Sequence, residues 1–339
     1  MAAVSARQKV FPEKEWDERE PAEVGLSAER LREAEAWLKA GCDGKRYRVA
    51  IVRHGCLAAE WRQAVEPDER LWLASAAKSV YSCVLGIAIA EGKIASADAH
   101  VIDYYPEMMD VPDGEGPKPG RFAREKDRAI TFRQLICNTS GYMKPGEMPG
   151  TVFHYQTFGM NILTHAIARQ YGCYDSNDPE RLPGFGKLMA EKIRDPIAAT
   201  WTCRYMNFQH PPEAKLGIFG YYHGISATAR DMARLGWLWL NCGNWNGTEV
   251  IPQEWMREIT KTAPDIKQHC SEEDWKYGHG FWTNDDGKLW PDLPRDAYAA
   301  RGAGGQHICV FPGLALVVAM SPCEQPEELL ARVVEACEQ

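Results

Sequence analysis

Residues 75–94 read SAAKSVYSCVLGIAIAEGKI, a mostly apolar run that changes the character of the chain. The run is typical of a buried helix, and we expect it to end near Gly92, because glycine suits the left-handed residue that follows many helices. Lys78 stands between apolar stretches of this run, where an exposed charged side chain is not expected. Ser75 and Lys78 therefore fall on one face of a buried helix, one turn apart.

The Ser75–Lys78 spacing fits a nucleophile and its base. A serine hydroxyl attacks a carbonyl only when a neighbouring group removes its proton, and a lysine can do so only when it is neutral near pH 7. Burial lowers the pKa of a lysine, and the positive end of a helix dipole disfavours a nearby cation. The alternative is a helix cap followed by an exposed lysine, and the spacing by itself does not decide between the two.

The segments before the helix predict a helix followed by a pair of strands. Residues 22–40 carry apolar residues at helical spacing around a Ser27 cap. Residues 48–61 read RVAIVRHGCLAAEW, two β-favouring runs that meet at His54-Gly55, as in a hairpin.

The end of the chain returns to strands and closes with a helix. Two apolar runs, split by Pro312-Gly313, precede an amphipathic segment over residues 325–338. We expect an α/β (α+β) fold, in which an antiparallel sheet flanked by the terminal helices carries an inserted all-helical lobe. The predicted sheet lobe comprises residues 20–75 and 243–339, the mainly helical lobe residues 76–242, and an N-terminal extension residues 1–19.

Composition narrows the possible partners and cofactors. The net charge of −8 and the absence of a Lys/Arg cluster argue against nucleic acid as a partner. No apolar run reaches membrane-spanning or signal-peptide length, so we expect no membrane partner and a cytoplasmic location. Eleven cysteines and nine histidines show no metal-binding spacing, so neither a metal nor another cofactor is expected. Oligomeric state cannot be read from the sequence.

Five segments, in this order along the chain, resemble the class C β-lactamase-related serine hydrolases. That group holds β-lactamase-type esterases, D-amino-acid-specific peptidases and 6-aminohexanoate-dimer hydrolase, and the resemblance covers roughly residues 24–320. It implies a β-lactamase and penicillin-binding-protein-like fold. The segments are WLASAAKS (72–79), ITFRQLICNTSGY (130–142), VFHYQTFGMNIL (152–163), GISATARDMARLGWLWLNCGNWNGTEVIPQEW (224–255) and YAARGAGGQHICVFPGLALVV (298–318).

The resemblance adds a third catalytic residue and a substrate-contacting one. A Tyr-x-Asn motif in that family places a tyrosine beside the nucleophile, and Tyr155-Gln156-Thr157 occupies its position here. Tyr155 is thus implied as a proton shuttle, against the alternative of a half-buried core tyrosine. Thr157 replaces the family's asparagine, which contacts the amide side chain of lactam substrates, and this departure weakens a lactam assignment.

The family's third motif lies on a strand and corresponds to Ala300-Arg301-Gly302 or, shifted by one residue, to Arg301-Gly302-Ala303. In either register the lysine of the lactam-cleaving members is missing. The resemblance implies that Gly302 lets substrate lie along the strand. The backbone N–H of Ala303 would form an oxyanion hole with that of Ser75. Arg301 is either a ligand for a substrate carboxylate or a solvated charge.

Further aromatic residues are candidates for substrate binding. Tyr142 follows the NTSG turn and could hydrogen-bond the scissile group, although turn tyrosines often only pack. Four tryptophans flank loops that should border a cleft between the lobes, and they suggest an apolar or aromatic acyl pocket, although tryptophans at this density more often belong to the core or to a lobe interface. They are Trp201, Trp275, Trp282 and Trp290.

These residues together predict a serine hydrolase that forms an acyl-enzyme on small carboxylic esters or short linear amides. Its partner would be that small-molecule substrate. The alternatives are a β-lactamase or D-peptidase, or a ligand-binding member of the fold without catalytic activity.

Overall fold

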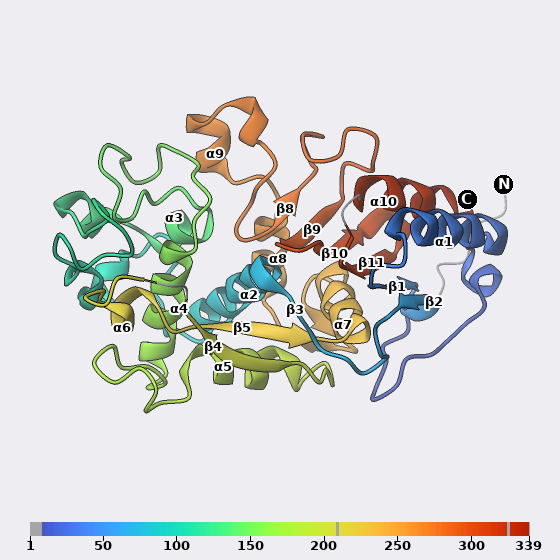
Figure 1. Cartoon of the computed structure of the whole chain (residues 1–339), viewed down its shortest axis with the longest axis horizontal. Helices are drawn as coiled ribbons and strands as arrows, with labels where there is room; N and C mark the ends of the chain where they lie inside the picture. Colours follow the sequence, from blue (N-terminus) through green and yellow to red (C-terminus); the bar gives the residue numbers. More distant parts are fainter. Residues whose placement is uncertain (1–8, 208–209, 324–325, 339) are drawn as a thin grey trace.

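The computed structural model describes residues 9–207, 210–323 and 326–338. A six-stranded antiparallel sheet forms one side of the molecule, and a mixed part built mainly of helices forms the other (Figure 1). The strand order β2-β1-β11-β10-β9-β8 brings strands from both ends of the chain together. The bounds are β1 Tyr47–Arg53, β2 Cys56–Gln63, β8 Trp282–Thr283, β9 Tyr298–Gly302, β10 Gln306–Phe311 and β11 Leu316–Ser321.

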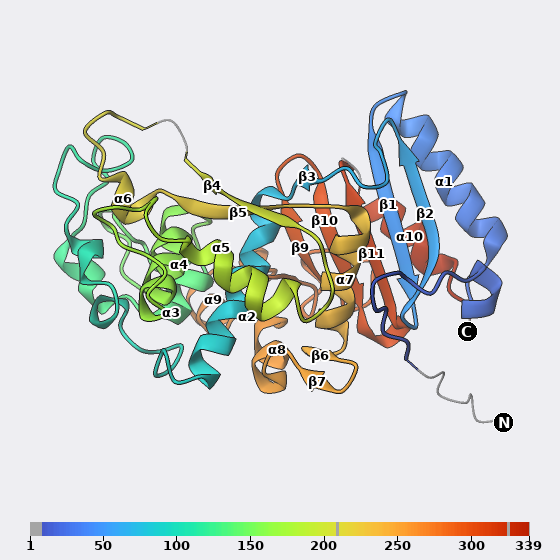
Figure 2. The same cartoon turned by 90° about the horizontal axis from the view of Figure 1, so that it is seen from below.

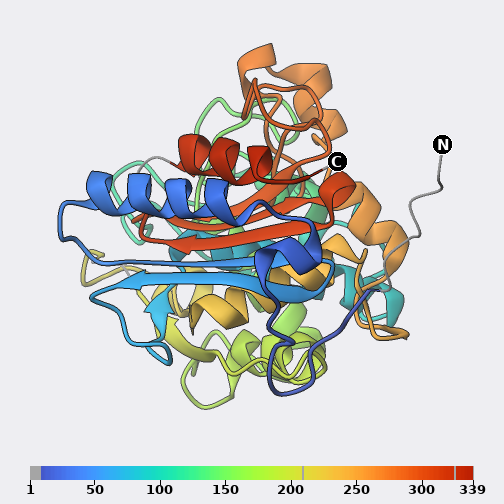
Figure 3. The same cartoon turned by 90° about the vertical axis from the view of Figure 1, so that its right-hand side faces the viewer.

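The sheet is covered on both faces, because its central strands are mostly apolar and have apolar side chains on both sides. Strands β1, β10 and β11 are fully buried. Helices α1 (Ala28–Cys42) and α10 (Pro326–Glu335) lie across the outer face (Figure 3). Helix α7 (Ala229–Leu240) packs against β1, β10 and β11 on the inner face. The sheet thus lies between two hydrophobic cores.

The remaining elements lie on the inner side of the sheet, where α2 runs through the centre (Figure 2). Helix α2 is buried over almost its whole length and ends before Gly92, as the sequence predicted. Among the helices in the described ranges, none is long and apolar enough to cross a membrane. The bounds are α2 Ala77–Ala90, α3 Phe132–Ile136, α4 Phe158–Gln170, α5 Gly184–Met189, α6 Leu216–Phe219, α8 Gln253–Ile259, α9 Pro264–His269, β3 Leu71–Trp72, β4 Thr202–Met206, β5 Tyr222–Ala227, β6 Asn244–Trp245 and β7 Thr248–Glu249.

The predicted fold class is confirmed, and several predicted elements are present. Strands β1 and β2 pair as the predicted hairpin, Ser27 caps α1, and the turn at Pro312 joins β10 to β11. Part of the predicted extension is structured, since Trp16 is buried and the backbone of residues 17 and 19 pairs with Leu57. Residues 1–8 of that extension, residue 325 of the predicted last helix and the terminal residue 339 lie outside the described residues.

Two features differ from the predicted lobes. The inserted part is not all-helical, because β3, β5 and β4 form a three-stranded antiparallel sheet within it. Helix α7 lies on the large sheet, although residues 76–242 were assigned to the helical lobe. Gly236 explains the close packing of α7, because a Cβ at this position would lie 2.4 Å from the side chain of Val317 on β11.

Candidate active site

Ser75 lies in a short 3-10 helix, Ala74–Ala76, that leads directly into α2. The turn before it is strained, since Ala74 has a φ of 48°, in the left-handed region that disfavours residues with a Cβ. The backbone N–H of Leu73 donates to the carbonyl of Ile225 on β5, which holds the turn from the other side. Ser75 remains partly exposed at the start of the helix, as a nucleophile requires.

Lys78 is the nearest basic group to Ser75. Its Nζ lies 2.7 Å from Ser75 Oγ, and the residue is only 4% exposed. Burial lowers the pKa of Lys78 from 10.5 to about 7. A substantial fraction of Lys78 is therefore neutral at pH 7 and can accept the proton of Ser75. The predicted pairing of the two side chains agrees with this geometry.

Tyr155 lies between α3 and α4, in a segment without regular secondary structure, and its side chain reaches Ser75. Burial raises the pKa of its hydroxyl, and a hydrogen bond with Ser75 opposes that rise. Lys78 Nζ lies 4.7 Å from the centre of the Tyr155 ring. Because its pKa lies above 10, Tyr155 is protonated at neutral pH and can donate to Ser75 or to a leaving group.

Thr157 completes the polar group around Lys78. Its Oγ1 lies 3.5 Å from Lys78 Nζ, at the limit of a hydrogen bond. The residue directly precedes α4 and is partly exposed. A threonine here can therefore contact both the lysine and a bound molecule, although it lacks the donor amide of the family's asparagine.

Gly302 brings strand β9 against the turn that carries Ser75. A Cβ built at Gly302 would lie 2.1 Å from the carbonyl oxygen of Leu73 and 3.0 Å from the backbone nitrogen of Ala76. Only glycine allows this approach, which places the end of β9 beside the turn that carries Ser75. Ala303 follows the strand and is exposed. Its predicted part in an oxyanion hole stays a prediction.

The side chain of Arg301 lies on the opposite face of the sheet from the face where Gly302 approaches Leu73, because neighbouring residues of a strand face opposite sides. Its guanidinium lies 5.2 Å from the centre of the Trp282 ring, and that ring stacks on Tyr155 with the centres 5.9 Å apart. Burial lowers the pKa of Arg301. Within the described ranges no carboxylate lies at ion-pairing distance from Arg301, although Glu327 of α10 acts electrostatically on it.

The structure does not bring every candidate to the site. Tyr142 is fully buried, and its hydroxyl donates to the carbonyl oxygen of Met108 at 2.6 Å, so it is not free to contact substrate. The four tryptophans do not form one pocket either. Trp201 and Trp290 are core residues, and Trp275 lies next to Lys267 of α9. Only Trp282 stands beside the catalytic candidates.

Two residues near Tyr155 did not emerge from the sequence. Tyr277 packs edge-on against the Tyr155 ring, with the centres 5.8 Å apart, and Asn138 hydrogen-bonds the Tyr277 hydroxyl. Asn138 belongs to the NTSG segment that carried part of the resemblance, but nothing in that motif reveals which side chains it meets. The described part of the chain holds no cluster of three or more residues suited to a metal ion.

This fold, with a buried lysine one turn after a partly exposed serine, defines a protein of the β-lactamase and penicillin-binding-protein class. The Beta-lactamase family model matches residues 43–328, and the chain belongs to that family. The 6-aminohexanoate-dimer hydrolase of Paenarthrobacter ureafaciens is 26% identical over 291 residues. That match covers 76% of this chain and 66% of the relative, a little less than two thirds of its length.

Solved structures of the same fold cover nearly the whole chain. A family VIII carboxylesterase aligns with a TM-score of 0.66 at 17% identity, over 92% of this chain and 99% of that one. A penicillin-binding protein homologue from Caulobacter crescentus aligns equally well, with a TM-score of 0.66 at 17% identity, over 92% of this chain and 98% of that one. A putative 6-aminohexanoate-dimer hydrolase from Bacillus anthracis aligns with a TM-score of 0.59 at 18% identity, over 97% of this chain and 88% of that one. At these identities the likeness establishes the fold alone.

Proposed function

We propose that the protein is a serine hydrolase that forms an acyl-enzyme on Ser75. The observation that carries this proposal is the 2.7 Å contact between Ser75 Oγ and Lys78 Nζ, combined with a lysine pKa of about 7. A lysine that only capped a turn or faced solvent would keep its ordinary pKa and stay charged. The buried, largely desolvated amine is instead suited to proton transfer.

The first half of the reaction transfers the acyl group to Ser75. Neutral Lys78 takes the hydroxyl proton while Ser75 Oγ attacks the carbonyl carbon of an ester or amide. Backbone N–H groups of Ser75 and Ala303 would hold the oxyanion. The bond to the leaving group then breaks, and the leaving oxygen or nitrogen takes a proton from Tyr155, which regains one from Lys78.

The second half releases the acyl group. Lys78, assisted by Tyr155, accepts a proton from water as the water oxygen attacks the acyl carbon. The bond between that carbon and Ser75 Oγ breaks, and Ser75 recovers its proton. The carboxylic acid leaves, and each group returns to its starting state, so the cycle requires no cofactor.

We rank small carboxylic esters first among substrates, short linear amides second and β-lactams last. Thr157 and the absence of a lysine beside Gly302 remove two features that serve lactam substrates in the resembling family. A relative named as a 6-aminohexanoate-dimer hydrolase and a structural neighbour named as a carboxylesterase support esters and linear amides. Arg301, which has no carboxylate at ion-pairing distance among the described residues, would favour substrates that carry a carboxylate.

Covalent labelling tests the nucleophile. Wild-type protein treated with a fluorophosphonate should gain one adduct by intact mass, and Ser75→Ala should gain none. Ser79→Ala is the matched control, because Ser79 lies about one turn further along, in α2, but is buried with its hydroxyl bonded to the Gly280 carbonyl. An unlabelled wild type, or labelling that survives Ser75→Ala, would favour a ligand-binding protein without catalytic activity.

A substrate panel tests the ranking. It should contain p-nitrophenyl esters of increasing acyl length, a linear 6-aminohexanoate amide and a chromogenic cephalosporin. We expect kcat/KM to be highest for an ester. Faster turnover of the cephalosporin than of every ester would favour the β-lactamase alternative and overturn the ranking.

A further inference from the structure

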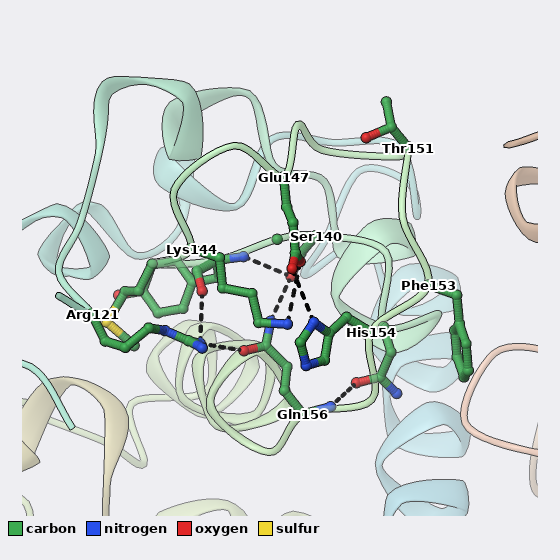
Figure 4. Close-up of polar contacts among 12 residues, drawn as sticks. Arg121, Ser140, Lys144, Glu147, Thr151, Phe153, His154 and Gln156 are labelled. Carbon is green, nitrogen blue, oxygen red and sulfur yellow. Dashed lines mark hydrogen bonds and ion pairs between the residues drawn. The ribbon is translucent and has the colours of Figure 1, made fainter. Parts of the chain in front are cut away.

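The segment that carries Tyr155 is held by side chains rather than by regular secondary structure. Residues 137–157 connect α3 to α4 without a helix or strand. A catalytic tyrosine on such a segment requires other contacts to keep its hydroxyl within reach of Ser75. The residues on either side of Tyr155, His154 and Gln156, both have such contacts (Figure 4).

Asn138 contacts both of these neighbours at the backbone. Its carbonyl oxygen accepts a hydrogen bond from the N–H of His154 at 2.9 Å, and its Oδ1 accepts one from the N–H of Gln156 at 2.9 Å. Asn138 is only 1% exposed. One buried residue therefore fixes the backbone immediately before and immediately after Tyr155.

The same side chain also acts on the ring of Tyr155. Asn138 Nδ2 donates to the hydroxyl of Tyr277 at 3.2 Å, and the Tyr277 ring meets the Tyr155 ring edge-on at an interplanar angle of 89°. Tyr277 is fully buried and cannot give way. Backbone and ring contacts together restrict Tyr155 to one position.

Asparagine suits this place for a conformational reason. Asn138 has a φ of 59°, in the left-handed region, which asparagine tolerates better than other residues with a side chain. In this conformation its carbonyl and its side chain both face the 154–156 segment, as the two 2.9 Å bonds require.

Two outer contacts secure the neighbours further. Arg121 donates to Gln156 Oε1 at 2.9 Å, and Glu147 Oε1 lies 2.9 Å from His154 Nδ1 (Figure 4). Lys144 holds the other oxygen of Glu147 at 3.2 Å. Although burial opposes it, the contacts from His154 and Lys144 lower the pKa of Glu147.

We propose that Asn138 is the positioning residue for Tyr155, because it holds the backbone on both sides of Tyr155 and the ring that packs against it. The proposal rests on the proposed function, in which Tyr155 transfers protons beside Ser75. Asn138 itself touches none of the reacting groups. Its effect on the reaction should therefore pass through Tyr155 and disappear when the Tyr155 hydroxyl is removed.

A double-mutant cycle tests this dependence. Asn138→Gly keeps the left-handed backbone and the carbonyl but removes both side-chain bonds. We expect kcat on the best ester to fall roughly 10- to 100-fold, with KM changed less than about 3-fold, since small misplacements of a catalytic group have effects of this size. In a Tyr155→Phe background the same change should lower kcat by less than about 3-fold. Equal losses in both backgrounds would overturn the proposal.

Two companion variants separate positioning from a general loss of stability. Asn138→Asp keeps the acceptor for the Gln156 N–H but loses the donor to Tyr277, so it should recover part of the lost kcat. Asn241→Gly is the matched control, because Asn241 is also a buried asparagine and its side-chain amide donates to the Trp237 carbonyl at the end of α7, away from Tyr155. It should destabilise the protein without the loss of kcat. A comparable loss of kcat in Asn241→Gly would contradict the proposal.

Fluorine NMR tests the position of Tyr155 without relying on activity. In protein labelled with 3-fluorotyrosine, the Tyr155 signal is assigned from its loss in Tyr155→Phe. Asn138→Gly should shift or broaden that signal, and Asn241→Gly should not. An unmoved Tyr155 signal would refute the proposal. A displaced signal in a protein that hydrolyses nothing would leave the positioning role standing and reject the hydrolase function instead.

Discussion

Lys78 illustrates how a side chain suited to proton transfer can oppose stability. The side chain is 4% exposed, and its nearest hydrogen-bonding partners are the hydroxyls of Ser75 and Thr157 rather than a carboxylate. Placing a cationic ammonium there is unfavourable, which is why its pKa falls to about 7. Burial therefore has two effects on Lys78. It keeps much of the amine neutral at neutral pH, so that the amine can act as a base. It also destabilises the folded state at every pH at which this lysine is protonated in the unfolded chain.

The variant Lys78→Met should be more stable than wild type at pH 7. Lysine has a pKa near 10.5 in the unfolded chain and about 7 in the folded protein. Between these values the unfolded state binds a proton that the folded state does not, so the free energy of unfolding of wild type rises with pH. The pKa difference corresponds to an upper limit of roughly 4 kcal/mol at pH 7, and the lost hydrogen bond to Ser75 reduces it.

Urea denaturation at several pH values measures this effect. We expect Lys78→Met to gain about 1–3 kcal/mol at pH 7 and to lose that advantage progressively toward pH 10.5. Hydrolysis should be abolished at every pH. A Lys78→Met protein less stable than wild type at pH 7 would contradict a largely neutral, desolvated lysine.

The rate of hydrolysis should depend on pH through the same group. Because the proposed reaction uses neutral Lys78, kcat/KM should rise with pH through about 7 and then level off. Tyr155 must be protonated to donate, and burial raises its pKa above 10, so the plateau should persist through pH 9. Initial rates on an ester across pH 5–9, corrected for spontaneous hydrolysis, provide the measurement. A rate that is flat from pH 5 to 8 would exclude Lys78 as the base.

Predictability from sequence differs between individual residues of the site. The contact between Ser75 and Lys78 follows from helical geometry, so the spacing of the two residues predicts it directly. The position of Tyr155 depends on a long connection without regular structure, and only the family resemblance indicated it. Tyr142 was misjudged because a turn residue can point inward or outward, and here its hydroxyl is used by the Met108 carbonyl. Asn138 could not be identified, since its partners lie up to 139 residues away.

At the scale of elements, β9 and the turn before α2 pack so closely that Gly302 leaves no room for a Cβ. Gly302 lies against the carbonyl of Leu73, and a Cβ would come within 2.1 Å of that oxygen. A backbone atom cannot move aside as a flexible side chain can. The strand and the nucleophile turn are therefore fitted to each other at this one residue.

Gly302→Ala should push β9 and the nucleophile turn apart. We expect a loss of about 1–3 kcal/mol in the free energy of unfolding, as overpacking usually causes. We also expect kcat/KM to fall about 100-fold or more, because Ser75 moves relative to the oxyanion donors. Gly41→Ala in α1 is the control, since a Cβ there meets nothing within 4 Å. Unchanged activity in Gly302→Ala would remove β9 from the catalytic site.

Secondary structure was more predictable than its placement. Alternating and helical apolar patterns correctly predicted the β1–β2 hairpin, α2 with its end near Gly92, and the β10–β11 turn. The same patterns do not say which surface an amphipathic helix covers. Helix α7 lies in the range predicted as the helical lobe, and it packs against the large sheet. The short strands β4 and β5 were missed because their burial is uneven.

At the scale of the whole molecule, helix α7 links parts of the chain that are distant in sequence. It packs on the large sheet and also contacts β5 of the smaller sheet. From α7, Arg234 donates to the carbonyl oxygens of Pro12, Lys14 and Ile197 at 3.2, 2.6 and 2.8 Å. One buried guanidinium thus ties the N-terminal segment and the helical part to the sheet.

Arg234 and Arg230 offer a matched comparison of how two arginines on one helix stabilise the molecule. They lie one turn apart on α7, but Arg234 is 3% exposed and bonds backbone carbonyls, whereas Arg230 is partly exposed and pairs with Glu18 and Glu60. Burial lowers the pKa of Arg234, and no neighbouring carboxylate is hydrogen-bonded to it among the described residues. Removing Arg234 leaves three buried or part-buried carbonyls without their donor, which is costlier than losing a surface ion pair.

Arg234→Met should lower the free energy of unfolding by about 2–4 kcal/mol, and Arg230→Met by about 1 kcal/mol or less. Methionine keeps much of the apolar stem in each case, so the difference reports on the guanidinium. Raising the salt concentration should narrow the gap between wild type and Arg230→Met by screening, while the deficit of Arg234→Met should persist. Limited proteolysis should cut the segment near residues 10–19 sooner in Arg234→Met, because that segment loses two of its anchoring bonds. Equal destabilisation by the two variants would show that the N-terminal segment and α7 are held together by apolar packing, with the buried arginine contributing little.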